Sequence, residues 1–270
     1  AEGGLVHLAA PSDARRVAQA AVPTRTTALG NCLAVLREGA MEDVAVKRLL
    51  PNYDVFDEQR YFQPGVGAPT VLSVMGQRVG LVVCEDAWVS DGPTSQLRGV
   101  DVLVAANASP YARGRQNDRE AMARERAVET GAVVVSVNAV GGQDELVFDG
   151  QSFATDATGT FARAAALTEA VLFVDTTDHQ ANELVAVPDP LAETYHALVL
   201  GTRDYILKNG FRSVVIALSG GVDSSLVAAI AVDALGPSAV RGFALPSRYS
   251  SDHSRSDACL LYTSDAADDT

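Results

Sequence analysis

The sequence predicts an α/β protein built as two domains, and three observations support this. An apolar run at residues 214–218, a glycine turn and an Ala/Leu/Val-rich run at residues 226–235 predict a strand, a turn and a helix. Farther upstream, short apolar runs that predict strands flank a charged helical stretch at residues 116–130. A polar segment that contains Pro188 and Pro190 separates the two regions and predicts a linker.

The predicted boundaries follow from these patterns. We expect a first domain at residues 1–180, a linker at 181–190, a second domain at 191–258 and a separate tail at 259–270. A chain of 270 residues, with 47% hydrophobic and 20% charged residues, is long enough to build packed cores of this kind.

The charge balance excludes some classes of partner. A formal net charge of −13 argues against a general surface for nucleic acids or acidic membranes, because such a surface must be basic. Cys32, Cys84 and Cys259 form no C-x-x-C pair, which is typical of a reducing compartment. The chain does not open on a signal segment, and no run of about twenty apolar residues occurs. We therefore expect a soluble, cytoplasmic protein without a nucleic-acid or membrane partner.

Four elements are predicted in the first fifty residues: a strand at 4–9, a helix at 11–22, and paired strands at 33–37 and 43–47. Lys47 ends the last of these strands. An aromatic and charged loop at residues 55–62 follows, and loops of this composition usually line a site or a core.

A hairpin at residues 70–83 delivers Cys84 at the carboxyl end of its second strand. Unpaired N–H groups at a strand-to-helix turn favour the thiolate, which is the reactive form of cysteine. Residue type alone leaves a second interpretation open, in which Cys84 is a small buried hydrophobe. Further strands are predicted at residues 102–105, 132–137, 146–148 and 170–174.

The glycine turn of the second domain predicts a phosphate site and has the sequence Ser219-Gly220-Gly221-Val222-Asp223-Ser224-Ser225. Helix N-termini attract anions, and glycines let the backbone approach a phosphate closely. The serines add hydroxyl donors, and Asp223 supplies a carboxylate for a magnesium ion that bridges phosphates. The pattern lacks the lysine of the G-x-x-x-x-G-K-[ST] loop. An ordinary strand-to-helix turn is the alternative interpretation.

Two further elements complete the second domain. Residues 191–209 predict an amphipathic helix, and residues 240–245 predict a second strand parallel to the first. Strand, helix and strand together make a doubly wound unit, whose nucleotide site lies at the carboxyl ends of its strands.

The glycine turn resembles the PP-loop of the ATP pyrophosphatase superfamily, and the upstream region resembles the nitrilase-type glutaminase domain of the glutamine-dependent NAD synthetase family. The upstream likeness rests on five motifs: K-x-x-L-P-N-Y at 47–53, V-F-D-E-x-R-Y-F-x-P-G at 55–65, C-E-D-x-W at 84–88, N-A-S-P-Y at 107–111 and G-G-Q-D-E-L-V-F-D-G at 141–150. A nitrilase-type half followed by a PP-loop half is the arrangement of that synthetase family.

The resemblance implies a nitrilase-like α-β-β-α sandwich, followed by the first part of a doubly wound, adenine nucleotide alpha hydrolase-like domain. It implies a Glu-Lys-Cys triad in which Cys84 attacks glutamine and Lys47 stabilises the charge of the tetrahedral intermediate. Tyr53, Ser109 and Arg115 fall where the family contacts glutamine.

The same resemblance implies that residues 219–225 bind ATP, with Mg²⁺ at Asp223, and that Arg248 of a second loop contacts the phosphates. The released ammonia would then amidate nicotinate adenine dinucleotide to NAD. Family members assemble into homo-oligomers, so we expect one. The alternatives are a module that only binds nucleotide or serves assembly, and a stand-alone nitrilase-family amidase.

Two expectations concern the ends of the sequence. The triad glutamate should lie on an early strand farther upstream of Lys47 than this sequence extends, so we expect a fragment with a truncated glutaminase domain. Residues 259–270 resemble the in-frame translation of a sequencing adaptor, which gives Cys259 no role. A divergent C-terminus is the alternative.

Overall fold

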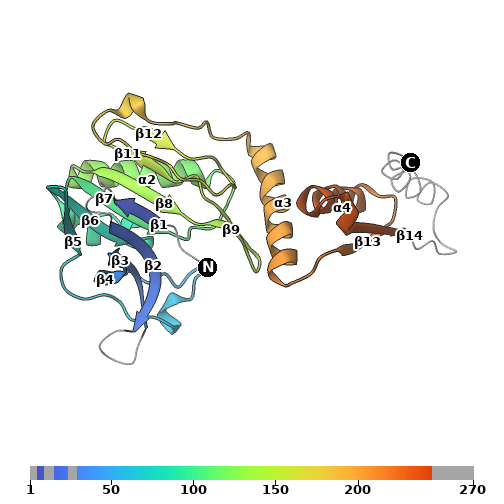
Figure 1. Ribbon diagram of the computed structural model, residues 1–270, viewed down its shortest axis with the longest axis horizontal. Helices are drawn as coiled ribbons and strands as arrows, with labels where there is room; N and C mark the ends of the chain where they lie inside the picture. Colours follow the sequence, from blue (N-terminus) through green and yellow to red (C-terminus); the bar gives the residue numbers. More distant parts are fainter. Residues whose placement is uncertain (1–4, 9–14, 24–28, 245–270) are drawn as a thin grey trace. The chain divides into compact units, whose positions relative to one another are not determined.

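A computed structural model describes residues 5–8, 15–23 and 29–244 of the chain (Figure 1). These residues form helices and mixed parallel and antiparallel sheets, as the predicted α/β class requires.

The chain divides into two compact units, which we describe separately. The first is drawn from residues 1–140 and 148–188, and the second from residues 141–147 and 189–270. Residues 141–147 thus belong with the second unit, although their sequence position lies inside the predicted first domain.

The first unit contains a four-stranded antiparallel sheet in the order β1-β2-β3-β4, with bounds Leu5–Leu8, Arg15–Pro23, Leu29–Arg37 and Ala40–Val46. The predicted helix at residues 11–22 is wrong, because β2 occupies most of it. Strand β2 pairs with β3 over nine residues, from Arg15 opposite Arg37 to Pro23 opposite Leu29. A register of this length favours the strand over local helix propensity.

A second sheet has six strands in the order β12-β11-β8-β7-β6-β5. The bounds are Val71–Val74 for β5, Gln77–Val83 for β6, Val102–Asn107 for β7, Val133–Asn138 for β8, Phe153–Thr155 for β11 and Thr160–Arg163 for β12. Strands β6, β7 and β8 are parallel to one another. Their carboxyl ends therefore meet at one edge of the sheet, which is where polar and reactive side chains gather in such folds.

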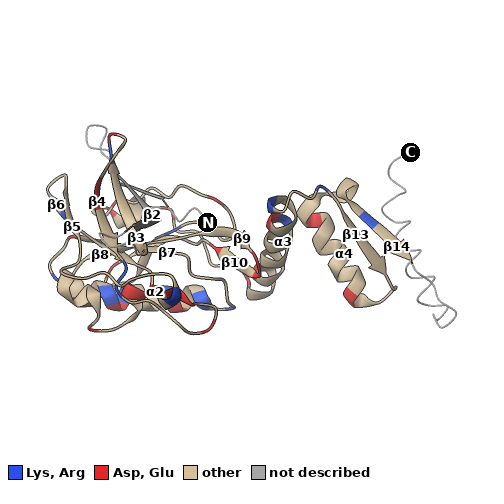
Figure 2. Cartoon of the chain, turned by 90° about the horizontal axis from the view of Figure 1, so that it is seen from below, with Lys and Arg blue, Asp and Glu red and all other residues tan. Residues whose placement is uncertain are grey.

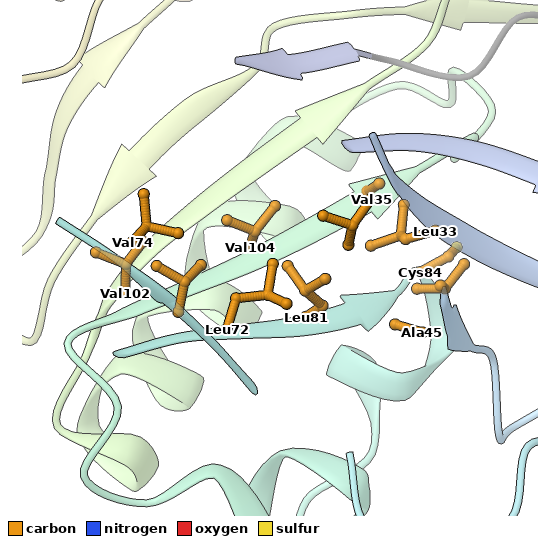
Figure 3. Close-up of a cluster of buried hydrophobic side chains, with 12 residues drawn as sticks. Leu33, Val35, Ala45, Leu72, Val74, Leu81, Cys84, Val102 and Val104 are labelled. Atoms are coloured by element: carbon orange, nitrogen blue, oxygen red, sulfur yellow. The ribbon is translucent and has the colours of Figure 1, made fainter. Parts of the chain in front are cut away.

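The core of the first unit has two layers, one on each face of the six-stranded sheet. Alternate residues of β6 enter different layers, because successive side chains of a strand point to opposite faces. Val79, Leu81 and Val83 pack with residues of β3 and β4, whereas Val82 packs with residues of the helix α2 (Arg115–Thr130) (Figures 1 and 3). The described layers are therefore sheet, sheet and helix.

Helix α2 begins after Gly114 and ends before Gly131, and both glycines have a left-handed backbone. Acidic and basic residues alternate along its length (Figure 2). Met122, Ala123 and Ala127 are buried against the sheet, so α2 is amphipathic as a covering helix should be.

Residues 170–174 do not form the predicted strand, and this prediction is wrong. Val171 and Phe173 are 78% and 84% exposed. The outer edge of β12 is already paired elsewhere, because Arg163 exchanges backbone hydrogen bonds with Glu183 and Val185. The outer edge of β12 is therefore not available to residues 170–174.

Short helices fill several connections of the chain. They are α1 (Glu85–Trp88) and the 3-10 helices Glu58–Arg60, Pro93–Leu97, His179–Ala181 and Pro237–Ala239. No helix in the described ranges is both long and apolar enough to cross a membrane.

The second unit contains α3 (Pro190–Lys208), β13 (Val214–Leu218), α4 (Val222–Leu235) and β14 (Val240–Ala244), and it takes in the turn of the hairpin formed by β9 (Val140–Gln143) and β10 (Leu146–Asp149). Strands β13 and β14 are parallel, which confirms the predicted strand, helix and strand unit.

Asp204 of α3 accepts the Gly142 N–H at 2.8 Å, and Lys208 donates to the Gly142 carbonyl at 2.6 Å. A Cβ atom at Gly142 would lie 3.1 Å from the Cα atom of Gly201, so glycine suits this approach.

Candidate active site

Cys84 stands at the carboxyl end of β6, where the strand turns into α1. Its φ angle of 45° and ψ angle of −102° are unusual for a residue with a side chain. The Cys84 N–H donates to the Ala106 carbonyl at 2.9 Å, and the backbone N–H of Ala108 lies near enough to the thiol to act on its pKa. These contacts tie the turn to the end of the neighbouring parallel strand β7.

The thiol of Cys84 is buried at one margin of the core, in the same cluster as Leu33 and Ala45 (Figure 3). Burial raises the pKa of Cys84 above its ordinary value of 9.0, and the nearby charges of Glu58 and Glu85 act in the same direction. The positive charge of Lys47 and the Ala108 N–H oppose this rise. The sequence argument that turn N–H groups would favour the thiolate is therefore only part of the balance.

We expect the rate of Cys84 alkylation by iodoacetamide to keep rising with pH above 9.0, where an ordinary thiol would level off. The reason is that only the thiolate reacts, and a raised pKa delays its formation. Mass spectrometry of the Cys84 peptide across pH 7 to 10.5 measures this rate. A plateau at or below pH 9.0 would contradict the described balance of burial and charge.

Lys47 lies just beyond β4 and is 1% exposed. Its ammonium group donates to Glu58 at 2.6 Å, and Asn31 donates to the other Glu58 oxygen at 3.2 Å. A buried lysine needs a paired charge of this kind. The sequence analysis did not single out Glu58 as the partner of Lys47, although it lies in the V-F-D-E motif. The available signal was an acidic residue in an aromatic loop that follows a candidate catalytic lysine.

Asp86 joins the chain around Lys47 to the chain around Cys84. Its carboxylate accepts the N–H groups of Arg48 at 3.0 Å and Leu49 at 2.8 Å, directly after Lys47 in the sequence. Burial raises the pKa of Asp86. The N–H groups of Arg48, Leu49 and Val83 oppose this rise but do not cancel it. Asp86, two positions after Cys84, therefore holds the segment that follows Lys47 against the turn that carries Cys84.

Tyr53, which was predicted to contact glutamine, donates its hydroxyl to both carboxylate oxygens of Glu85 at 2.9 Å. Burial and this contact raise the pKa of Tyr53 to about 12, so the phenol stays protonated at neutral pH. Arg115, the first residue of α2, is close enough to act on Tyr53 electrostatically. No described residue accepts a hydrogen bond from the Arg115 guanidinium, which leaves it for a ligand.

Ser109, the second predicted glutamine contact, is 7% exposed and follows Ala108, whose N–H acts on the pKa of Cys84. Asn138, at the end of β8, accepts from the Ser109 N–H at 2.9 Å and donates to the Ser109 carbonyl at 3.1 Å. The structure thus brings Cys84, Lys47, Tyr53, Ser109 and Arg115 to one edge of the first unit.

The glycine turn of the second unit has the geometry expected of a phosphate loop. Gly220 has a φ angle of 79°, which requires glycine, and α4 begins after Gly221 without a side-chain cap. The Ser219 and Ser224 hydroxyl oxygens lie 3.1 Å apart, and Asp223 is exposed in the first turn of the helix. The Ser224 and Ser225 hydroxyls both donate to the Gly221 carbonyl at 3.0 Å. The uncapped N-terminus of α4 fits an anion such as a phosphate, because helix N-termini carry unpaired N–H groups.

Some predicted residues lie outside the described ranges, namely Arg248 of the second ATP loop, Cys259 and the tail at 259–270. Among the residues with described positions, no three His, Cys, Asp or Glu side chains are grouped as a metal site. A magnesium ion that is bound mainly through substrate phosphates needs only one or two protein carboxylates. The role of Asp223 as a magnesium ligand stays a prediction.

Comparisons with known proteins decide the family. The carbon-nitrogen hydrolase family model matches residues 17–183, which is more than half of the chain. The chain belongs to the carbon-nitrogen hydrolase family. The family domain is followed by a match to the NAD synthase family model at residues 194–266.

The chain is similar to curated glutamine-dependent NAD(+) synthetases. It is 45% identical to the one from Xanthomonas campestris over 235 residues, and 40% identical to the one from Aquifex aeolicus over 271 residues. These alignments cover 81% and 86% of the chain but only 41% and 48% of the relatives. The chain therefore spans less than half the length of these relatives.

Solved structures agree with this assignment. The ADP complex of the glutamine-dependent NAD+ synthetase from Acinetobacter baumannii matches with a TM-score of 0.83 and 37% identity, over 90% of this chain and 47% of that one. The synthetase from Cytophaga hutchinsonii, at 19% identity and a TM-score of 0.71 over 90% of this chain and 49% of that one, supports the fold alone. The predicted fold class and the predicted family resemblance are confirmed. The roles of individual site residues stay predictions.

Proposed function

We propose that this chain carries the glutaminase site and the ATP loop of a glutamine-dependent NAD synthetase. The observation that supports the proposal is that Cys84, Lys47 and the predicted glutamine contacts Tyr53, Ser109 and Arg115 lie near one another in a domain that matches the carbon-nitrogen hydrolase model. That domain precedes a match to the NAD synthase model.

The chemistry at the first site is amide hydrolysis through a thioester. The Cys84 sulfur attacks the carboxamide carbon of glutamine, and the carbonyl oxygen becomes negatively charged. Lys47 stabilises this charge, because a fixed cation in a dry site needs no reorganisation during the reaction. The carbon–nitrogen bond then breaks, ammonia leaves with a proton, and water hydrolyses the thioester to glutamate.

At the second site, residues 219–225 would hold the phosphates of ATP, and Asp223 would hold Mg²⁺. Mg²⁺ held there would supply neutralisation of the phosphate charge. Residues 219–225 would position the phosphates of ATP for adenylation of the carboxylate of nicotinate adenine dinucleotide. The ammonia from the first site would displace AMP from that adenylate. We extend the proposal to a cytoplasmic homo-oligomer, as the family resemblance implies.

The experiment that tests the first site uses a chloroketone in which CH2Cl replaces the amide nitrogen of asparagine. Its electrophilic carbon then occupies the chain position of the carboxamide carbon of glutamine. We expect it to alkylate Cys84 far faster than chloroacetone does, and to leave the buried Cys32 of β3 unmodified. Peptide mass spectrometry measures both sites. Equal rates for the two chloroketones at Cys84 would contradict a glutamine pocket.

A further inference from the structure

A buried ion pair lies directly beneath the loop that carries Ser109. Arg119 of α2 and Asp149 of β10 are 3% and 1% exposed, and their closest charged atoms are 2.8 Å apart. Asp149 also accepts from Gln151 at 3.1 Å and from Asn138 at 3.4 Å. Burying two charges is costly unless the pair makes further hydrogen bonds. The other hydrogen bonds of Arg119 therefore indicate which part of the structure the ion pair supports.

Those hydrogen bonds converge on two consecutive residues of the loop. Arg119 Nη2 donates to the carbonyls of Ser109 at 2.9 Å and Pro110 at 3.1 Å, and Nε donates to the Ser109 hydroxyl oxygen at 3.2 Å. The guanidinium group thus donates hydrogen bonds to both the backbone and the side chain of Ser109. Asn138 holds the same residue from the neighbouring strand.

The contact from Nε determines how the Ser109 hydroxyl can act. A guanidinium nitrogen only donates, so the Ser109 oxygen accepts from it. The hydroxyl proton is then directed away from Arg119, and no described residue accepts it. A serine held in this way offers a hydrogen-bond donor to a ligand.

The surroundings favour an anionic acceptor for this proton. Arg115 lies one helical turn before Arg119 on α2, and no described residue accepts from its guanidinium. The loop residue before Ser109 lies near enough to the Cys84 thiol to act on its pKa, so Ser109 lies near any substrate that Cys84 attacks.

We propose that Arg119 is a positioning residue, which fixes the Ser109 hydroxyl as a hydrogen-bond donor to the carboxylate of an amino-acid substrate. The proposal rests on the proposed glutaminase function and deepens it. Arg119 itself does not touch the substrate, and it acts through Ser109.

The test compares alkylation of Cys84 by three chloroketones: the amino-acid probe, the same molecule without its carboxylate, and chloroacetone. The ratio of the rates for the first two probes reports on recognition of the carboxylate. This ratio also cancels any change in the reactivity of the Cys84 thiol, because both probes attack the same sulfur. We expect Ser109→Ala and Arg119→Lys each to lower this ratio roughly tenfold, the size of one hydrogen bond to a charged group. Rates with chloroacetone should stay within about twofold of the unsubstituted protein, because it has no head group to recognise.

A double variant separates positioning from general damage. If Arg119 acts through Ser109, Arg119→Lys should have no further effect on the ratio once Ser109 is alanine. Arg126→Lys is the matched control, since Arg126 is a second buried arginine of α2 that contacts Val89 and Ser90 instead. Its ratio should stay unchanged even if the protein is destabilised.

Three results would overturn the proposal. They are an unchanged ratio in Arg119→Lys, additive effects in the double variant, and a loss in Arg126→Lys as large as that in Arg119→Lys. If Arg119→Lys does not fold, Ser109→Ala alone still decides whether that hydroxyl recognises the carboxylate. Failure of the amino-acid probe to outpace chloroacetone in the unsubstituted protein would instead contradict the glutaminase function.

Discussion

Cys84→Ala is expected to abolish glutamine-dependent NAD formation, in a synthetase of the relatives' length that carries this chain, while synthesis from free ammonia continues. Alanine keeps the apolar packing of Cys84 in the buried cluster but removes the sulfur that forms the thioester. The ATP loop lies in the other compact unit, so its chemistry does not need the thiol. Glutamate release and NAD formation, each measured with glutamine and with ammonium chloride, check this expectation.

Cys32→Ala is the matched control for this experiment. Cys32 is also a buried cysteine of the first unit, but it lies within β3 rather than at the turn after β6. It should leave both activities in place. Persistence of glutamine-dependent synthesis in Cys84→Ala would remove Cys84 from its role. Loss of ammonia-dependent synthesis as well would point to structural damage rather than to chemistry.

The fold was largely predictable wherever one face or both faces of an element were apolar. Strand β13 matches its predicted bounds, and α2 agrees to within one residue. The failures lie where tertiary pairing decides the outcome. Residues 11–22 have a helical pattern, but the nine-residue register with β3 makes most of them a strand. Residues 170–174 have a strand pattern, but the segment near Val185 already occupies the edge of β12.

The positions of the candidate reactive residues could be predicted from the sequence, but the residues that hold them in place could not. Cys84 and Lys47 stand at strand ends, which sequence patterns can locate. Glu58 and Asp86 matter because of what they hold, and their partners lie 11 to 38 residues away in sequence. A pattern along the chain contains no information on such pairs. The same reasoning applies to Arg119, which in sequence is one of several arginines on a charged helix.

Glu58→Gln is expected to lower the free energy of unfolding by about 3 kcal/mol, because it leaves the ammonium of Lys47 buried without a counter-charge. The Lys47 and Glu58 side chains are 1% and 15% exposed, and their charged atoms are 2.6 Å apart. Removing one partner of a buried pair costs more than the pair itself contributes, since the other charge stays out of water. Urea unfolding followed by circular dichroism measures the change.

Asp57→Asn provides a neighbouring control for this substitution. Asp57 pairs with Arg60 at the same separation of 2.6 Å, but the two side chains are 43% and 69% exposed. Loss of this ion pair should lower the free energy of unfolding by less than about 1 kcal/mol, because solvent screens exposed pairs. Replacing both buried partners, as in Lys47→Met with Glu58→Leu, should restore much of the stability while glutamine hydrolysis stays lost. Equal costs for Glu58→Gln and Asp57→Asn would mean that water reaches Lys47. The dry oxyanion site that Lys47 is proposed to provide would then lose its physical basis.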